Sequence, residues 1–372
     1  MKKIYWRPTS ITIRVYLLIA AVSVSCLFAV ETLKVRKEQP YYSEKMEAAR
    51  LAGEAFQRIR ELRKEQNKIS DSEFDPSRSG LIGSFLTPVT SNTGTLTAKQ
   101  TSVNPNFAGL VVEFLKQAGV NEGGTVAVGL SGSFPALNIC VYAAGKALHL
   151  KLVPISSLSS SQWGANDPEF LWADMERVLF LEKILPYRSL ALSYGGLEDR
   201  ALGLSSEGKN LLNEAVKRNS LPLLSGNSFT SSVEERMRKF KEGAKGERIQ
   251  AYVNVGGGTI SVGTRAGKQS FKPGLNLSSL PGADKIDSVM TRFLREDIPV
   301  IHLIEIEELA KKYGFPLRPK TTPKGGEGEI FSKVEYSRWF AGVVLSAILF
   351  LIYGLFRTGG RIAADPDTGF PI

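Results

Sequence analysis

Residues 125–155, TVAVGLSGSFPALNICVYAAGKALHLKLVPI, carry the clearest structural pattern in the sequence. Short apolar segments at 125–130 and 151–155 lie on either side of a longer segment at 134–148. This order predicts a strand, a helix and a second strand, which is the repeating unit of a parallel sheet. Strands that are apolar almost throughout are typical of a sheet with helices on both faces.

The same alternation continues through most of the chain. We expect further strands at 189–193, 249–255 and 298–303, and a short apolar stretch at 221–224. The segments between them predict helices at 105–119, 168–185, 206–219, 230–243, 284–295 and 304–314. The predicted fold class is therefore α/β, with a mainly parallel, doubly wound, Rossmann-like sheet.

The segments that flank this pattern have a different character. Residues 43–68 combine helix formers with spaced apolar residues and predict an amphipathic helix, which could serve as a stalk. Residues 70–106 are rich in Ser, Thr, Asn, Gly and Pro and predict a loop with one short strand at 81–86. Residues 318–332 contain GGEG, prolines and several basic residues, and predict a linker.

Each end of the chain contains an apolar segment long enough to cross a bilayer. Residues 15–30, VYLLIAAVSVSCLFAV, carry no charge, and the segment extends back to residue 11. A helix needs about 20 residues to cross the hydrocarbon core. Cleavage as a signal peptide and lipidation at Cys26 are the alternatives to a retained span. Phe28-Ala29-Val30-Glu31 is a poor cleavage site, and Ser23 does not fit a lipidation motif.

The second apolar segment, WFAGVVLSAILFLIYGLF at 339–356, lies between Arg338 and Arg357. Trp339 and Tyr353 stand toward its ends, as interfacial aromatic residues do. With two spans, the whole middle region lies on one side of the membrane. The basic residues beside the spans favour an extracytoplasmic domain by a small margin, which predicts a two-pass protein of the cell (inner) membrane.

These observations predict the organisation of the chain. It has a tail at 1–10, a transmembrane helix at 11–30, a helical stalk at 31–69, an α/β domain at 70–317, a linker at 318–338, a transmembrane helix at 339–356 and a tail at 357–372. About half of the net charge of +10 lies beside the apolar segments, where it favours anionic lipid headgroups. The remainder forms no Arg/Lys block, so nucleic acid is not an expected partner. Cys26 and Cys140 lie in apolar stretches and are expected to be free thiols.

The turn Gly129-Leu130-Ser131-Gly132-Ser133 is the first candidate site. It joins a strand to a helix, where ligands bind in open α/β sheets, and its small residues leave backbone N–H groups open to an anion. We take Gly129, Ser131, Gly132 and Ser133 as candidate ligand contacts and Ser131 as a candidate nucleophile. The G-x-S-x-S pattern departs from a nucleophile elbow, and only His149 or His302 could complete a triad. A tight turn with a serine cap is the structural alternative.

The segment VNVGGGTISVGT at 253–264 is the second candidate and predicts a strand, a glycine turn and a strand. It is similar to the phosphate hairpin of actin-like ATPases, although Asn254 replaces the acidic residue and no second phosphate loop is evident. Nucleotide contacts would come from Asn254, Gly256, Gly257, Gly258 and Thr259. The alternative is a structural glycine hairpin.

The third candidate is SQWGANDPEFLWAD at 161–174. Trp163 lies in a loop beside several serines, and with Asn166, Asp167 and Glu169 it predicts a site for a sugar or peptide-like ligand. Asp167 followed by Pro168 also fits the start of a helix. No His/Cys/Asp cluster has metal-ligand spacing, and no cofactor is expected.

Four segments in this order resemble the bacterial poly-gamma-glutamate system protein family. They are GLIGSFLTPVTSNTGTLTAKQTSVNPNFAGLVVEFLKQAGV at 80–120, VAVGLSGSFPALN at 126–138, SQWGANDPEF at 161–170 and VNVGGGTISVG at 253–263. The resemblance covers residues 75–280 and the anchoring ends. It implies a membrane protein encoded with the machinery that makes or exports poly-gamma-glutamate, and it supplies no catalytic residues. The implied partners are the lipid bilayer, other membrane proteins of that machinery and the polyanionic polymer.

We therefore expect a membrane-anchored accessory component of poly-gamma-glutamate synthesis or export that is not itself an enzyme. Two alternatives stay open. One is an extracytoplasmic serine hydrolase that acts on polymer or envelope through Ser131. The other is a nucleotide-binding regulator, which would require the domain to be cytoplasmic.

Overall fold

The computed structural model describes residues 13–263, 267, 270–278 and 285–362. The chain divides into two compact units. Gln39–Phe331 forms one unit, called here the domain, and Met1–Glu38 with Ser332–Ile372 forms the other, called here the anchor. The tail predicted at 1–10 and the last ten residues of the chain lie outside the described residues.

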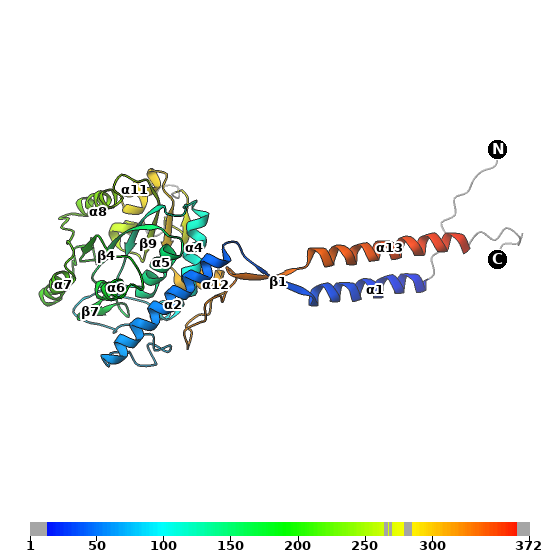
Figure 1. Ribbon diagram of the computed structural model, residues 1–372, viewed down its shortest axis with the longest axis horizontal. Coiled ribbons are helices and arrows are strands. Elements are labelled where there is room, and N and C mark those ends of the chain that lie inside the picture. The colour runs from blue at the N-terminus through cyan, green and yellow to red at the C-terminus, as the bar shows by residue number, and fades with distance from the viewer. Residues whose placement is uncertain (1–12, 264–266, 268–269, 279–284, 363–372) are drawn as a thin grey trace, which may run out of the picture. The chain divides into compact units, whose positions relative to one another are not determined.

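A six-stranded sheet forms the centre of the domain (Figure 1). Its strand order is β10-β11-β9-β3-β4-β8, and all neighbours are parallel except β10, which is antiparallel to β11. The strands are β3 (Thr125–Leu130), β4 (Lys151–Ser157), β8 (Ala191–Ser193), β9 (Ile249–Val255), β10 (Gly274–Asn276) and β11 (Val300–Leu303). The mixed α/β class and the mainly parallel sheet predicted from the sequence are confirmed.

The strand order reverses at β3. From β3 the chain adds β4 and then β8 on one side, and then places β9 and β11 on the other side. The carboxyl ends of all five parallel strands therefore lie at the same edge of the sheet. Loops that follow β3 and β9, the two strands at the reversal, must diverge there and leave a crevice.

Helices pack on both faces of this sheet. Along β3, Val126, Val128 and Leu130 belong to one hydrophobic core, and Ala127 belongs to another. The first core is built with α2 (Tyr42–Glu65), α4 (Asn106–Gln117), α5 (Pro135–Ala147), α6 (Trp172–Leu181) and α12 (Ile306–Lys312). The second core is built with α8 (Phe229–Gly243), α9 (Thr259–Val262) and α11 (Val289–Arg295). A third, smaller core packs α7 (Ser206–Asn219) beside α6.

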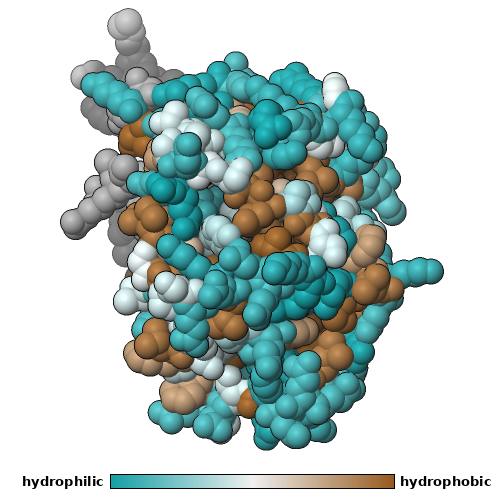
Figure 2. All heavy atoms as spheres, turned by 90° about the vertical axis from the view of Figure 1, so that its left-hand side faces the viewer, coloured by the Kyte–Doolittle hydropathy of each residue, from teal (hydrophilic) through white to brown (hydrophobic). Residues whose placement is uncertain are grey.

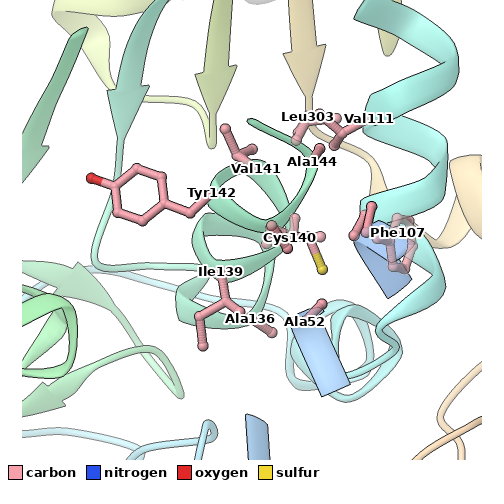
Figure 3. Packing of buried hydrophobic residues seen from close by; sticks show 14 of the residues in the cluster. Ala52, Phe107, Val111, Ala136, Ile139, Cys140, Val141, Tyr142, Ala144 and Leu303 are labelled. Carbon is pink, nitrogen blue, oxygen red and sulfur yellow. The ribbon is translucent and has the colours of Figure 1, made fainter. Parts of the chain in front are cut away.

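Helix α5 lies at the centre of the first core, with most of its residues buried. Figure 3 shows its apolar side chains between Phe107 and Val111 of α4 and Ala52 of α2, with Leu303 of β11 close by. Cys140 of α5 is buried in this packing as a free thiol, and burial raises the pKa of that thiol above its usual value. An unreactive, apolar role therefore suits Cys140.

The amphipathic helix predicted at 43–68 exists as α2, but it is part of the domain and not a stalk. Its apolar face is buried in the first core. Lys45 of α2 is fully buried, where it forms an ion pair with Glu113 of α4 and donates a hydrogen bond to the Ile330 carbonyl at 2.8 Å. The sequence showed one apolar face, but not which surface that face would meet.

The segment predicted as a loop and residues 318–331 of the predicted linker are also ordered parts of the domain, whereas residues 332–338 belong to the anchor. No strand forms at 81–86; instead β2 (Thr90–Asn92) pairs with β5 (Ser160–Ser161), and α3 (Leu96–Ser102) follows it. Asn106 fixes the predicted linker, since its Nδ2 donates to the Lys324 carbonyl at 2.7 Å and its Oδ1 accepts from Gly326 N at 2.8 Å. Both arrangements depend on partners distant in sequence.

Two further elements differ from the sequence prediction. The helix expected at 168–185 is shortened to α6, because β6 (Asn166–Asp167) and β7 (Phe170–Leu171) form a small antiparallel pair before it. Asp174, not Asp167, satisfies the start of this helix by accepting a hydrogen bond from Leu171 N at 2.8 Å. The stretch at 221–224 forms only a single bridge, between Leu192 and Leu223.

The anchor contains two long apolar helices, α1 (Ile13–Thr32) and α13 (Arg338–Ile362), which lie side by side (Figure 1). Both are long and apolar enough to cross a membrane, as predicted, and none of their apolar windows is buried by protein. Beyond them, β1 (Lys34–Glu38) pairs antiparallel with β12 (Ser332–Tyr336) in a two-stranded ribbon. The sequence did not predict this ribbon.

Two glycine substitutions test the packing of the domain. A Cβ added at Gly109 of α4 would lie 2.6 Å from Phe331 Cζ, whereas a Cβ at Gly53 of α2 would meet no atom within 4 Å. We expect Gly109→Ala to lower the free energy of unfolding by roughly 1–3 kcal/mol through overpacking. We expect Gly53→Ala to raise it by up to about 1 kcal/mol through helix propensity.

The measurement is urea unfolding of the full-length protein in detergent micelles. A stabilising effect of Gly109→Ala would contradict the docking of Phe331 on α4.

Candidate functional site

A cleft of about 640 Å³ lies at the carboxyl edge of the sheet. Residues at or just beyond the ends of four parallel strands line it: Ser131 after β3, Ser157 at the end of β4, Gly257 after β9 and Ile304 after β11. This is the crevice expected where the strand order reverses. We refer to it below as the cleft.

The structure brings two of the three predicted sites together in the cleft. Gly129, Ser131 and Ser133 come from the first, and Asn254, Gly257, Gly258 and Thr259 come from the second. The two turns are in close contact, because a Cβ added at Gly256 would lie 3.3 Å from Ser131 Cβ. Gly256 also has a φ of 86°, which favours glycine.

Gly129 and Gly132 are tight packing positions. A Cβ at Gly129 would lie 2.2 Å from Tyr252 Oη, and one at Gly132 would lie 2.9 Å from the Ser159 carbonyl oxygen. The carbonyl of Gly132 accepts a hydrogen bond from Ala165 N at 2.8 Å. These glycines therefore let neighbouring strands and loops approach closely enough to close the wall of the cleft.

The second strand predicted after the glycine turn does not form among the described residues. After Gly258 the chain enters the short helix α9 instead, so the segment is a strand–turn–helix unit and not a glycine hairpin. Asn254 holds this turn: its Nδ2 donates to the Gly256 carbonyl at 2.6 Å and to His302 Nδ1 at 3.1 Å. Burial lowers the pKa of His302 to about 4, so this imidazole is neutral at pH 7.

Ser131 has no histidine partner among the described residues. Its Oγ accepts a hydrogen bond from Ser133 N at 3.2 Å, so it stabilises the tight turn before α5 but does not cap this helix. His302 bonds to Asn254 and is fully buried in β11. His149 follows the carboxyl end of α5, away from the turn that begins this helix, and is exposed. The triad that a serine hydrolase would need is not assembled around Ser131.

Lys99 of α3 is the most unusual side chain in the cleft, and no pattern in the sequence indicated that it would be buried there. It is only 3% exposed. Its Nζ donates to the Ser133 carbonyl, lies 2.8 Å from Ser161 Oγ, and stands 3.8 Å from the centre of the Phe134 ring. Burial lowers the pKa of Lys99 to about 7, and within the described part of the chain no carboxylate forms an ion pair with it.

The rest of the cleft lining is strongly polar. Arg236 is buried and pairs with Asp199 at 2.6 Å, while its Nη2 donates to Ser193 Oγ at 2.7 Å. Asp199 has a φ of 64°, so this ion pair is held by a loop in a left-handed conformation. Glu305, Glu307 and Glu308 line the cleft where α12 begins.

The third predicted site lies apart from the cleft and has structural roles. Trp163 stacks on Phe74, with ring centroids 4.7 Å apart. Asn166 is buried and holds Ser84 through its Oδ1 and Nδ2, at 2.9 and 2.7 Å. Asp167 pairs with Arg63 at 2.7 Å, and Glu169 pairs with Lys68 at 2.6 Å. These four side chains fasten α2 and the loop before β2 to the domain.

Comparisons with known proteins found no relative: no family model, no curated protein and no solved structure matches the chain. Within the described residues, no group of three or more His, Cys, Asp or Glu side chains is placed to hold a metal ion. What the cleft binds must therefore be inferred from its own side chains.

The pH dependence of stability tests the environment of Lys99. Its folded pKa of about 7 lies below its ordinary value of 10.5. Between these pH values the unfolded chain binds more protons, so Lys99 makes stability rise with pH. Lys99→Met should remove this contribution, which amounts to at most about 1.4 kcal/mol per pH unit. The measurement is the free energy of unfolding in detergent micelles from pH 7 to pH 10, compared between variant and wild type.

Lys151→Met is the matched control, because the Lys151 ammonium is exposed beside Glu247. If Lys99→Met kept the wild-type slope over this pH range, Lys99 would not be buried as an unpaired ammonium.

Proposed function

We propose that this chain is a membrane-anchored, non-catalytic accessory component of poly-gamma-glutamate synthesis or export, and that its domain binds a small ligand in the cleft. The observation that carries the ligand-binding role is Lys99, a buried amine with no counter-ion among the described residues, in a cleft of ligand size. Small-molecule sites usually have volumes of about 300–1,000 Å³.

The anchor supports attachment to a bilayer. Ile13, Phe28, Trp339 and Phe350 on its helices are each more than two-thirds exposed, which water would disfavour. On the surface of the domain shown in Figure 2, by contrast, apolar residues are interrupted by hydrophilic ones. The antiparallel ribbon of β1 and β12 supports a two-pass arrangement, because it joins both helices at the same end. We propose the cell (inner) membrane, with an extracytoplasmic domain.

The fold supports a ligand-binding role. The reversal of strand order at β3 and the helices on both faces are the features of a doubly wound, Rossmann-like sheet, which is the fold we propose. In such sheets ligands bind where the strand order reverses, and this is where the cleft lies.

The link to poly-gamma-glutamate rests on the sequence resemblance. The segments that carry it include 80–120, 126–138 and 253–263, which supply Lys99, Ser131 and Gly257 to the cleft. The segments that resemble the family therefore include residues that line the cleft as well as residues of the hydrophobic core. Other membrane proteins of the machinery and the polymer are the proposed partners.

Neither alternative function is favoured by the cleft. A hydrolase acting through Ser131 would need a general base in contact with its Oγ, but the Lys99 amine contacts Ser161 Oγ and the Ser133 carbonyl instead. A nucleotide would bring several negative charges next to Glu305, Glu307 and Glu308, which line the cleft.

Membrane fractionation tests the anchor. We expect the full-length protein to stay in the membrane pellet after carbonate washing, because two apolar helices of 18 residues or more are exposed. A variant lacking 339–356 should stay in the pellet through α1 but should present its C-terminus on the other side, which reporter fusions at residue 365 would detect. Recovery of intact full-length protein in the soluble fraction would rule out the membrane role.

Polymer production tests the pathway. In a cell that makes poly-gamma-glutamate with this chain, deletion of the gene should lower the amount of polymer released. Ser131→Ala should leave amount and chain length unchanged, whereas Lys99→Met should reduce the amount at equal protein level. Unaltered polymer after deletion would refute the pathway assignment. Loss of polymer in Ser131→Ala at a normal protein level would favour the hydrolase.

A further inference from the structure

Two buried lysines, Lys45 and Lys99, indicate which class of ligand the cleft binds. They differ in whether a carboxylate of the protein pairs with the ammonium. Lys45 of α2 is fully buried and pairs with Glu113. Lys99 of α3 is almost as buried, but its contacts are a carbonyl, a hydroxyl and an aromatic ring, which are all neutral. Burial of an ammonium is costly unless an anion compensates it. Lys45 has that anion within the protein, and Lys99 does not among the described residues.

Two further features of the cleft wall favour an anion beside Lys99. Phe134 and Ser133, which Lys99 contacts, directly precede the 13-residue helix α5, whose first turn has no side-chain cap. The positive end of the helix dipole therefore lies on the same side as the ammonium. Ser159 also lines the cleft, and its Oγ is buried without a hydrogen-bond partner in the described structure. A buried hydroxyl without a partner is rare in folded proteins, so Ser159 Oγ has an unused hydrogen bond at the cleft wall.

Negative charge lies in another part of the same cleft, where α12 begins. Glu305, Glu307 and Glu308 line it, and none of them forms an ion pair with a described residue. Glu305 has a φ of 50°, a conformation that costs a residue with a side chain roughly 1–2 kcal/mol. A hydrogen bond shared with Glu308 raises the pKa of Glu305, as expected for two carboxylates held together. A cation placed here would relieve that repulsion.

The charge balance excludes a ligand with several negative charges. Among the described residues of the lining, Lys99 and Arg236 are the basic ones, and Arg236 is already paired with Asp199. Three unpaired glutamates therefore face a single unpaired lysine. A polyphosphate or a polycarboxylate would be repelled over most of the cleft, whereas a molecule with one anionic and one cationic end would match both regions.

We propose that the cleft binds a zwitterion of the amino-acid or short-peptide class, with its carboxylate at Lys99, Ser159 and the start of α5, and its ammonium toward Glu305 and Glu308. This inference rests on the proposed ligand-binding role of the cleft and does not depend on the polymer pathway. The cleft volume of about 640 Å³ accommodates an amino acid or a dipeptide. On this proposal the polymer does not enter the cleft, and its contact with the protein lies elsewhere.

Calorimetric titration of the full-length protein in detergent micelles tests the proposal. The probes are L-glutamine and glycylglycine as zwitterions, N-acetylglycylglycine without the ammonium, glycylglycinamide without the carboxylate, and inorganic phosphate. We expect at least one zwitterion to bind at millimolar concentration or better, and loss of either charge from glycylglycine, if this probe binds, to weaken binding at least about tenfold, which corresponds to 1.4 kcal/mol. Tighter binding of phosphate, or no binding of either zwitterion, would overturn the proposal.

Variants assign the two ends of the ligand. Lys99→Met should abolish the preference for a free carboxylate, and Glu305→Gln with Glu308→Gln should abolish the preference for a free ammonium. The controls are Lys151→Met and Glu296→Gln, which remove exposed charges outside the cleft. The glutamates are surface-accessible, so their substitution tests the proposal even if Lys99→Met fails to fold. The assigned orientation of the ligand would be wrong if each variant weakened the binding of N-acetylglycylglycine and of glycylglycinamide by the same factor.

The outcomes separate this inference from the pathway proposal. Zwitterion binding in a protein whose deletion leaves polymer production unchanged would support the ligand class and refute the pathway. Altered polymer production in Lys99→Met, together with absent zwitterion binding, would support the pathway and refute the ligand class.

Discussion

The position of β3 is the constraint on which the domain depends. β3 pairs in parallel with β4 on one side, from Thr125–Lys151 to Leu130–Ser156, and with β9 on the other. Parallel strands require long crossover connections, which here are helices on the faces of the sheet. Their carboxyl ends must then meet at one edge. The cleft is the direct result, because the loops after β3 and β9 leave that edge in different directions.

Several polar side chains and left-handed residues of the domain lie at this edge. Away from it, the buried charges of Lys45 and Asp174 have ionic partners in the protein, Glu113 and Arg218. At the cleft, by contrast, Lys99 lacks an ionic partner in the described structure, Ser159 Oγ lacks a hydrogen bond there, and Asp199 and Glu305 have left-handed backbones. Each of these lowers stability by itself. Their occurrence together is typical of a site that is completed by a ligand.

The sequence predicted those elements whose pattern is local. The strands at 125–130, 151–155 and 249–255 and the helices between them follow from runs of apolar residues that any sheet of this kind would bury. The turn at Gly129–Ser133 and the turn at Gly256–Thr259 were recognised because glycine and serine mark close approach. That these turns would share one cleft follows from the strand order, which a single sequence does not contain.

Elements that depend on distant partners could not be predicted. Lys99 lies in a segment of low hydrophobicity, and only the contacts of α3 with Ser133 and Ser161 make it a buried residue. Asn106 holds Gly326, more than 200 positions away. Trp163 was expected to be exposed for a ligand, but Phe74 covers it. In each case the amino-acid pattern of the segment contains no information about the distant residue that it contacts, so the contact could not be predicted from that pattern.

The ribbon of the anchor has a consequence for the order in which the protein assembles. Arg36 Nε donates to Ser332 Oγ at 2.6 Å, although 296 residues separate them in sequence. Closing a flexible loop of that length would cost about 5 kcal/mol of chain entropy, more than a short exposed ribbon returns. Within the domain, however, Gln39 N donates to the Phe331 carbonyl at 2.9 Å, so a folded domain already holds its two ends together. In the proposed membrane arrangement, α1 would enter the bilayer before α13 has been synthesised. Pairing of these two helices would then follow the folding of the domain that lies between them in the sequence.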